Sequence, residues 1–298
     1  MAITITPEIK DKVHEAMIEQ RKNFCGTNGQ FAKMYGLSGS AFTRIHNGER
    51  EGVLSPTKWL LLAQEFGVSL ESKKWNTAKT DVFRVIEEEI LFCKAYSKAR
   101  ICVDECGIGK TFTAKYLART VRNCFYVDAS QAKTRTQFIR SMAKCIGADF
   151  QGRYYDVKTS LKIHLKTMPQ PVVIIDEAGD LEYQAFLELK ELWNATEGFV
   201  GWYLMGADGL RAKIERGITN RTVGYAEIFS RFSEKYTRIV PNDQRERISF
   251  YKKLITDVLS ANNCPAEEMN RIVKRCLTND RGNDIGGLRR AESLLILS

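Results

Sequence analysis

The sequence Asp-Glu-Cys-Gly-Ile-Gly-Lys-Thr occupies residues 104–111, between a predicted strand and a predicted helix. Backbone N–H groups in the turn from Gly107 to Gly109 can surround a β-phosphate, and the helix N-terminus behind them favours negative charge. Lys110 supplies a positive charge to the β- and γ-phosphates, and Thr111 supplies a hydroxyl to magnesium. We therefore predict a nucleoside triphosphate site made by Gly107, Ile108, Gly109, Lys110, Thr111 and Phe112.

Residues 172–177, Val-Val-Ile-Ile-Asp-Glu, are typical of a buried strand that carries two carboxylates at its tip. We predict that Asp176 holds magnesium through water, together with Thr111, and that Glu177 polarises the water that attacks the γ-phosphate. Glu177 therefore favours hydrolysis over simple binding. The phosphate-loop pattern departs at one position, because Asp104 stands where a glycine is usual. An aspartate can adopt turn geometry, but its charge is unfavourable near phosphates unless the side chain points away.

Strand and helix patterns alternate through residues 81–240. This alternation predicts an α/β domain with a parallel sheet that is covered on both faces. A loop is expected after the fourth strand, before a helix at 223–231. The remaining residues, 241–298, have helical patterns and no strand pattern. Strands are expected at 99–104, 124–128, 171–176, 200–206 and 235–240.

Residues 1–67 predict a separate, all-helical domain, and the polar residues 68–80 predict a linker. Two short helical patterns are joined by a turn at Gly36, with Ser38 as N-cap of the second helix and Gly48 as its stop. This is helix-turn-helix order. The second helix directs Arg44 and Asn47 outward, so these two are candidates for contacts to DNA.

The composition is that of a globular protein: 298 residues, 44% apolar and 27% charged. No apolar run approaches the about 18 residues of a membrane span, and the N-terminus lacks the pattern of a secretory signal. The eight cysteines form no CxxC pair and are interpreted as reduced thiols of a cytoplasmic protein. The net charge of +9 fits a polyanionic partner without identifying it.

The two motifs, together with the sequences that follow them, resemble those of a known protein family. The phosphate loop and the Asp-Glu strand are followed by Gly206, by Asn-Arg-Thr-Val-Gly-Tyr-Ala-Glu-Ile-Phe-Ser-Arg-Phe at 220–232 and by Gly-Gly-Leu-Arg-Arg at 286–290. This order resembles the AAA+ ATPases, and more narrowly the phage Mu transposition protein B group, over nearly the whole chain. The resemblance implies a P-loop AAA+ module at 81–240, a C-terminal helical lid at 241–298 and an N-terminal helix-turn-helix domain at 1–67.

The resemblance also assigns residues that the motifs alone do not. Arg231 matches the arginine finger, which acts on the nucleotide of a neighbouring subunit. Arg289 matches the second sensor, which contacts the γ-phosphate from the lid, with Arg290 as the alternative. The first-sensor position departs from the pattern, since Ala207 and then Asp208 stand where a polar residue, usually asparagine, is expected. The implied cofactors are ATP and Mg²⁺.

The implied partners are duplex DNA, a transposase and further copies of the chain, which assemble as a filament or ring in the ATP state. The implied setting is a bacterial cytoplasm, with the gene on a phage or mobile element. Two other functions remain open: a helicase loader with the same ATPase core, and a helix-turn-helix regulator switched by nucleotide. The N-terminal domain can also be a protein-contact module. Candidates for phosphate contacts in the AAA+ module are Lys133, Arg135, Lys158 and Lys162.

Overall fold

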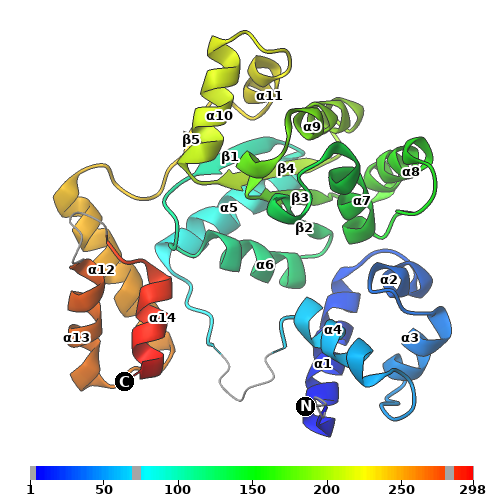
Figure 1. The fold of residues 1–298 in the computed structure, drawn as a ribbon, viewed down its shortest axis with the longest axis horizontal. Coiled ribbons are helices and arrows are strands. Elements are labelled where there is room, and N and C mark those ends of the chain that lie inside the picture. Colours follow the sequence, from blue (N-terminus) through cyan, green and yellow to red (C-terminus); the bar gives the residue numbers. More distant parts are fainter. Residues whose placement is uncertain (1–4, 69–74, 279–284, 298) are drawn as a thin grey trace.

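The computed structural model describes residues 5–68, 75–278 and 285–297. Its centre is a five-stranded parallel sheet in the order β2-β3-β4-β1-β5 (Figure 1). The parallel sheet predicted from the alternation of strands and helices is therefore confirmed. Its strands are β1 (Ala99–Val103), β2 (Cys124–Asp128), β3 (Val172–Asp176), β4 (Gly201–Gly206) and β5 (Tyr236–Thr237).

Helices cover both faces of the sheet, as the nearly continuous apolar runs of its strands require. One face, with Cys102, Ile174 and Tyr203, packs against α5 (Asp81–Tyr96) and α6 (Lys110–Thr120). The other face, with Val173 and Trp202, packs against four further helices. Each fully buried aliphatic side chain contributes about 1.5–3 kcal/mol, so these two layers supply most of the stability. The four helices are α7 (Arg135–Ile146), α8 (Tyr154–Thr167), α9 (Tyr183–Ala195) and α10 (Asp208–Thr219).

The parallel strands all end at the same edge of the sheet, where ligands bind in open α/β folds. The phosphate-loop sequence leaves β1 there and enters α6. Glu177 leaves β3 at the same edge and leads into the short helix η2 (Ala178–Asp180). The topology thus brings the two motifs of the sequence to one edge.

The N-terminal region contains α1 (Pro7–Asn23), α2 (Asn28–Met34), α3 (Gly39–His46) and α4 (Pro56–Glu65). The side chains of Thr27 and Ser38 cap α2 and α3. These helices pack on α6 and α7: the Asn23 side chain donates to the backbone oxygen of Arg119 (2.6 Å). The Phe24 ring lies against Gly147, where an added Cβ would be 2.6 Å from the ring.

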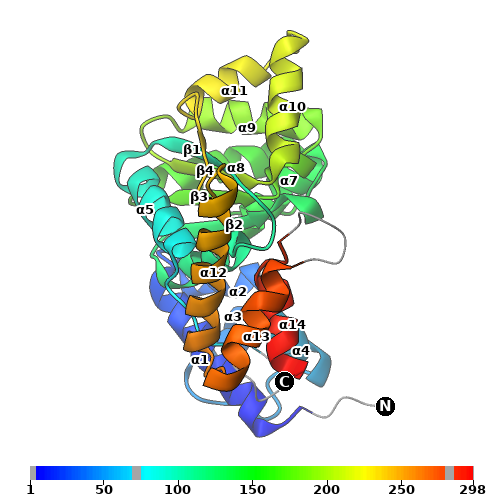
Figure 2. The same ribbon diagram turned by 90° about the vertical axis from the view of Figure 1, so that its left-hand side faces the viewer.

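The C-terminal helices are α12 (Gln244–Ala261), α13 (Ala266–Leu277) and α14 (Leu288–Leu297). In Figure 1 they lie below the central module at the lower left, whereas α1–α4 lie at the lower right. α13 and α14 pack against each other and against α12 (Figure 2). Their apolar side chains, such as Tyr251 and Leu254, continue the core on the α5–α6 side of the sheet. We call these three helices the lid.

Two elements differ from the expectations. The last strand, expected at 235–240, is only two residues long, because the following chain turns away to hydrogen-bond with Asp104. The segment expected as a loop before α11 (Tyr225–Arg231) contains α10, whose apolar positions are few among charged ones. Residues 69–74 of the predicted linker lie outside the described residues. Within the described chain, no helix has the length and apolarity to cross a membrane.

Candidate nucleotide-binding site

The phosphate loop has the backbone shape that its glycines permit. Gly107 and Gly109 have φ values of 76° and 103°, a left-handed conformation that a residue with a side chain rarely adopts. Gly109 is the N-cap of α6, so the free N–H groups of the first helical turn face the loop. A helix N-terminus of this kind attracts an anion through its N–H groups and its dipole.

Lys110 is tied to the loop that precedes it. Its ammonium group donates to the backbone oxygens of Asp104 and Glu105, both at 2.7 Å, and the residue is only 8% exposed. An ammonium group has three N–H donors, so one remains for a ligand. The lysine charge is thereby held at the loop before any phosphate binds.

Asp176 and Glu177 lie at the tip of β3. Asp176 is buried, and its carboxylate accepts hydrogen bonds from the Tyr126 hydroxyl and the Glu177 N–H, both at 3.0 Å. Glu177 has a φ of 49°, a strained conformation for a residue with a side chain, of the kind found at functional sites. Partial burial raises the pKa of Glu177, and the neighbouring Asp176 charge raises it further.

The donor set fits Mg²⁺ bound together with a nucleotide. Among residues 5–68, 75–278 and 285–297, no basic side chain pairs with Asp176, and no group of three acidic, cysteine or histidine residues forms a metal cage. Mg²⁺ is ordinarily held by one or two carboxylates plus substrate phosphates, and it prefers oxygen ligands. Asp176 and the Thr111 hydroxyl would supply such oxygens, with phosphates completing the shell.

A cavity of about 340 Å³ lies over the phosphate loop, which is within the size range of small-molecule sites. Arg289 lines it, whereas Arg290 does not, and Asp176 lies just outside it, next to Glu177. The other predicted residues that line it are Gly107, Ile108, Gly109, Lys110, Thr111, Phe112 and Glu177.

The cavity also has apolar lining residues that the motifs did not reveal. They are Trp75 from the segment before α5, Phe83 from α5 and Val258 from the lid. Asn76 holds this segment to the lid, because its N–H donates to the Asn262 side chain at 2.7 Å. The only sequence signal was Trp75, a large apolar residue in an otherwise polar linker.

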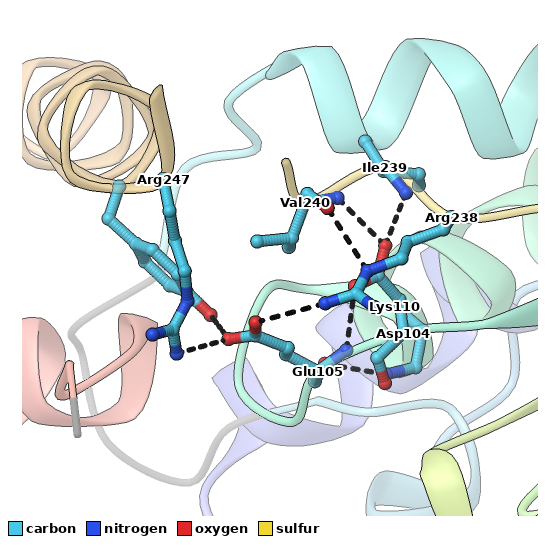
Figure 3. Close-up of polar contacts among 8 residues, drawn as sticks. Asp104, Glu105, Lys110, Arg238, Ile239, Val240 and Arg247 are labelled. Atoms are coloured by element: carbon cyan, nitrogen blue, oxygen red, sulfur yellow. Dashed lines mark hydrogen bonds and ion pairs between the residues drawn. The ribbon is translucent and has the colours of Figure 1, made fainter. Parts of the chain in front are cut away.

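Asp104 points away from the cavity. One carboxylate oxygen accepts the N–H groups of Ile239 (2.5 Å) and Val240 (3.0 Å), and the other accepts that of Glu105 at 2.7 Å (Figure 3). The residue is 3% exposed and does not line the cavity. The aspartate therefore replaces the usual glycine without placing its charge against the phosphates.

Residues 95–214 match the family model described as AAA domain. No curated protein matches the chain. The fold has a distant similarity to a crystal structure of NtrX from Brucella abortus in complex with ATP, with 14% sequence identity and a TM-score of 0.45. That match covers 87% of this chain and 64% of the other, so the chain spans less than two thirds of that protein's length.

Two residues carried over from the resemblance lie away from the nucleotide cavity. Arg231, on α11 and beyond the residues that match the family model, stacks its guanidinium on the Trp193 ring, 5.2 Å from the ring centre. Its Nη1 is buried and has no hydrogen-bond acceptor within the described part of the chain. Ala207 occupies the N-cap position of α10 without a side-chain cap, and Asp208 is the exposed first residue of that helix. Neither residue lines the cavity.

All five basic residues proposed for DNA contact have carboxylate partners. Lys158 is 8% exposed and pairs with both Glu188 and Glu191. Arg44 and Asn47 of α3 are exposed, and Arg44 pairs with Glu49 at 2.8 Å. The other three pairs are Lys133–Asp180 (2.8 Å), Arg135–Glu188 (2.6 Å) and Lys162–Glu191 (2.6 Å).

Proposed function

We propose that the protein is a magnesium-dependent ATPase. The observation that carries this proposal is a single cavity lined by the phosphate loop, Lys110, Glu177 and Arg289. The apolar side chains of Trp75 and Phe83, which line the cavity, are suited to contact with a purine ring. The loop N–H groups and the free donor of Lys110 would bind the phosphates. Thr111 and Asp176 would hold Mg²⁺, which would supply charge neutralisation on the phosphate oxygens.

The residues of the chain then divide the work of hydrolysis. Glu177 accepts a hydrogen bond from the attacking water and orients it, while its raised pKa makes it a better proton acceptor. Lys110 and Arg289 stabilise the negative charge that spreads over the phosphate oxygens in the transition state. The Tyr126 hydroxyl keeps Asp176 in place.

The test is ATP binding and hydrolysis by the wild type and by Lys110→Ala. We expect magnesium-dependent release of phosphate by the wild type and loss of binding and turnover in the variant. Lys98→Ala removes an exposed lysine outside the cavity and is the matched control. Absence of ATP binding by the wild type, or equal loss in both variants, would refute the proposal.

We further propose that ATP-bound copies assemble on duplex DNA and present it to a transposase, as the resemblance to the Mu transposition protein B group suggests. The exposed polar face of α3 supports DNA binding, as does the net charge of +9. Contacts through Arg44 of α3 are favoured over contacts through Arg135 and Lys158, because these two pair with the buried Glu188, whereas Arg44 pairs with the half-exposed Glu49.

Arg231 supports the participation of a second copy. It lies away from the cavity of its own chain, and its buried Nη1 has no hydrogen-bond acceptor within the described residues. A buried polar group without a partner destabilises a protein, so an acceptor from outside the chain would be favourable. The nucleotide of a neighbouring copy offers such acceptors.

Electron microscopy of the full chain with duplex DNA, in ATP, in ADP and without nucleotide, tests the assembly. Filaments that form only with ATP, on any sequence, would support the target-selector function. Binding to one sequence by single copies, with nucleotide acting only as a switch, would instead support the regulator function, which the exposed α3 also allows.

The site of DNA contact is tested by salt titration. Each phosphate contact on a duplex contributes a slope of about −0.9 to log affinity against log salt, so Arg44→Ala should flatten the slope by about one unit. Lys22→Ala, an exposed lysine on α1, is the matched control and should leave the slope unchanged. An unchanged slope in Arg44→Ala would exclude this residue as a phosphate contact.

A further inference from the structure

The phosphate loop begins with two carboxylates, one bound to the segment before the lid and the other bound to the lid itself. Asp104 accepts the N–H groups of Ile239 and Val240, in the segment that connects β5 to α12. Glu105 accepts hydrogen bonds from Arg247 (2.8 Å) and from the Tyr251 hydroxyl (2.7 Å), both on α12. The two acidic residues thus hold the connecting segment and the first lid helix at the same end of the loop (Figure 3).

The same two residues hold the phosphate-binding lysine. Lys110 donates to their backbone oxygens at 2.7 Å, so any shift of the loop backbone moves the ammonium group as well. Arg238 lies between the two carboxylates: its Nε donates to the Val240 backbone oxygen (3.2 Å), and its Nη2 is 3.8 Å from Glu105. One network therefore contains the lysine, the connecting segment and the lid.

The lid also contacts the loop through backbone atoms. The N–H of Leu288, at the start of α14, donates to the backbone oxygen of Gly107 at 2.8 Å. A Cβ at Gly287 would lie 2.7 Å from that oxygen, so only glycine allows this approach. The lid is therefore seated on the phosphate loop at two separate places.

Glu105 is suited to an ionic contact at neutral pH. Partial burial would raise its pKa, but the hydrogen bonds from Arg247 and Tyr251 and the charges of Arg247 and Arg238 outweigh this effect and lower it. The contribution of Glu105 to holding the lid is therefore present above the ordinary pKa of a glutamate. It is lost only as the pH falls through the lowered pKa.

We propose that Asp104 and Glu105 form a latch that seats the lid on the phosphate loop before nucleotide arrives and thereby sets nucleotide affinity. The proposal rests on the proposed function, because it concerns the same ATP site. The closed lid carries Arg289, Val258 and Leu288 to the cavity. A lid that is open part of the time lowers apparent affinity in proportion to the fraction closed.

The test uses amide hydrogen exchange and ATP affinity in the full chain. In nucleotide-free Asp104→Asn and Glu105→Gln, exchange of a peptide that covers residues 238–251 should be at least fivefold faster than in the wild type. ATP affinity should fall by a similar factor, at the lower end of the about 5- to 150-fold range of ordinary coupling between sites. Saturating ATP should restore slow exchange.

Two further variants keep the test decisive. Glu246→Gln removes an exposed charge from the first turn of α12 and should change neither quantity. Tyr251→Phe removes only the hydroxyl that binds Glu105, so its effect should not add to that of Glu105→Gln. This cycle covers the case in which Asp104→Asn does not fold.

The outcomes separate the latch from the ATPase proposal. Unchanged exchange in Asp104→Asn and Glu105→Gln would overturn the latch, and so would faster exchange with unchanged ATP affinity. An Asp104→Gly variant that binds ATP as well as the wild type would show that Asp104 has no part in the latch. Absence of ATP binding by the wild type would refute the proposed function instead.

Discussion

Tyr126→Phe tests whether the carboxylate of Asp176 serves a metal ion. The substitution removes one hydroxyl and leaves the ring in place on β2. The structure shows two donors to the Asp176 carboxylate, the Tyr126 hydroxyl and the Glu177 N–H, both at 3.0 Å. Because Asp176 is 1% exposed, water cannot easily replace the lost donor. The carboxylate would therefore lose the contact that fixes its orientation.

The magnitude follows from the kind of bond that is lost. A hydrogen bond to a charged group contributes about 1.5–3 kcal/mol, which corresponds to roughly 10- to 150-fold in an equilibrium constant. Loss of a group that orients a metal ligand ordinarily reduces metal affinity or activity by about 10- to 100-fold. We therefore expect the Mg²⁺ concentration for half-maximal ATP hydrolysis to rise by about tenfold or more in Tyr126→Phe.

The assay is phosphate release at fixed ATP over a Mg²⁺ titration, with thermal unfolding measured in parallel. Tyr203→Phe is the matched control, because its buried hydroxyl donates to a carboxylate, Glu89, that does not line the nucleotide cavity. This control should lower stability without shifting the Mg²⁺ dependence. If both variants shift it equally, or if neither does, then Tyr126 does not position a metal ligand.

Three other outcomes are expected. Glu177→Gln should retain ATP binding while turnover falls about a hundredfold. Steady-state phosphate release and nucleotide affinity are measured together. Unchanged turnover would show that Glu177 does not orient the attacking water. A mixture of Arg231→Ala and Lys110→Ala should recover part of the DNA-stimulated turnover. At a shared interface, the first variant would supply an intact nucleotide site and the second an intact Arg231. Mixtures that stay inactive would argue against a role of Arg231 in trans. Glu89→Ala should lower the free energy of unfolding by about 3 kcal/mol, because it leaves the Tyr203 hydroxyl and Arg100 without their buried carboxylate. Denaturant titration measures this loss, and a value below about 1 kcal/mol would contradict the account.

The nucleotide cavity was predictable from the sequence where its residues are close together in the chain. Gly107 and Gly109 shape the backbone of one turn and Lys110 begins the helix that follows it, so their spacing in the sequence was enough to predict the loop. The orientation of Asp104 was not predictable, because the N–H groups that it accepts lie 135 and 136 residues further along the chain. Trp75 illustrates the same limit, since only the folded lid shows that its segment borders the cavity.

The sheet and its covering helices were predictable because their strands are long apolar runs between clear helical patterns. The helix α10 was not, since most of its positions are charged or small and its buried side chains are few. Propensity is a weak guide in such a segment, and packing decides its structure. In α10 the contacts of Leu210 and Ile214 with the core stabilise the helix.

The charge of the chain shows why a sum over the sequence does not locate a DNA surface. A net charge of +9 attracts a polyanion from a distance, whichever residues carry it. Affinity and its salt dependence instead count the cations that reach phosphates. Lys133 and Arg135 already pair with Asp180 and Glu188, so contact with DNA would exchange one anion for another. Arg44 faces a smaller loss than Arg135, because Glu49 is half-exposed and water can solvate it when the pair separates, whereas Glu188 is buried. Of the proposed DNA contacts, Arg44 on α3 could therefore reach a phosphate with a smaller structural loss than Arg135 or Lys158.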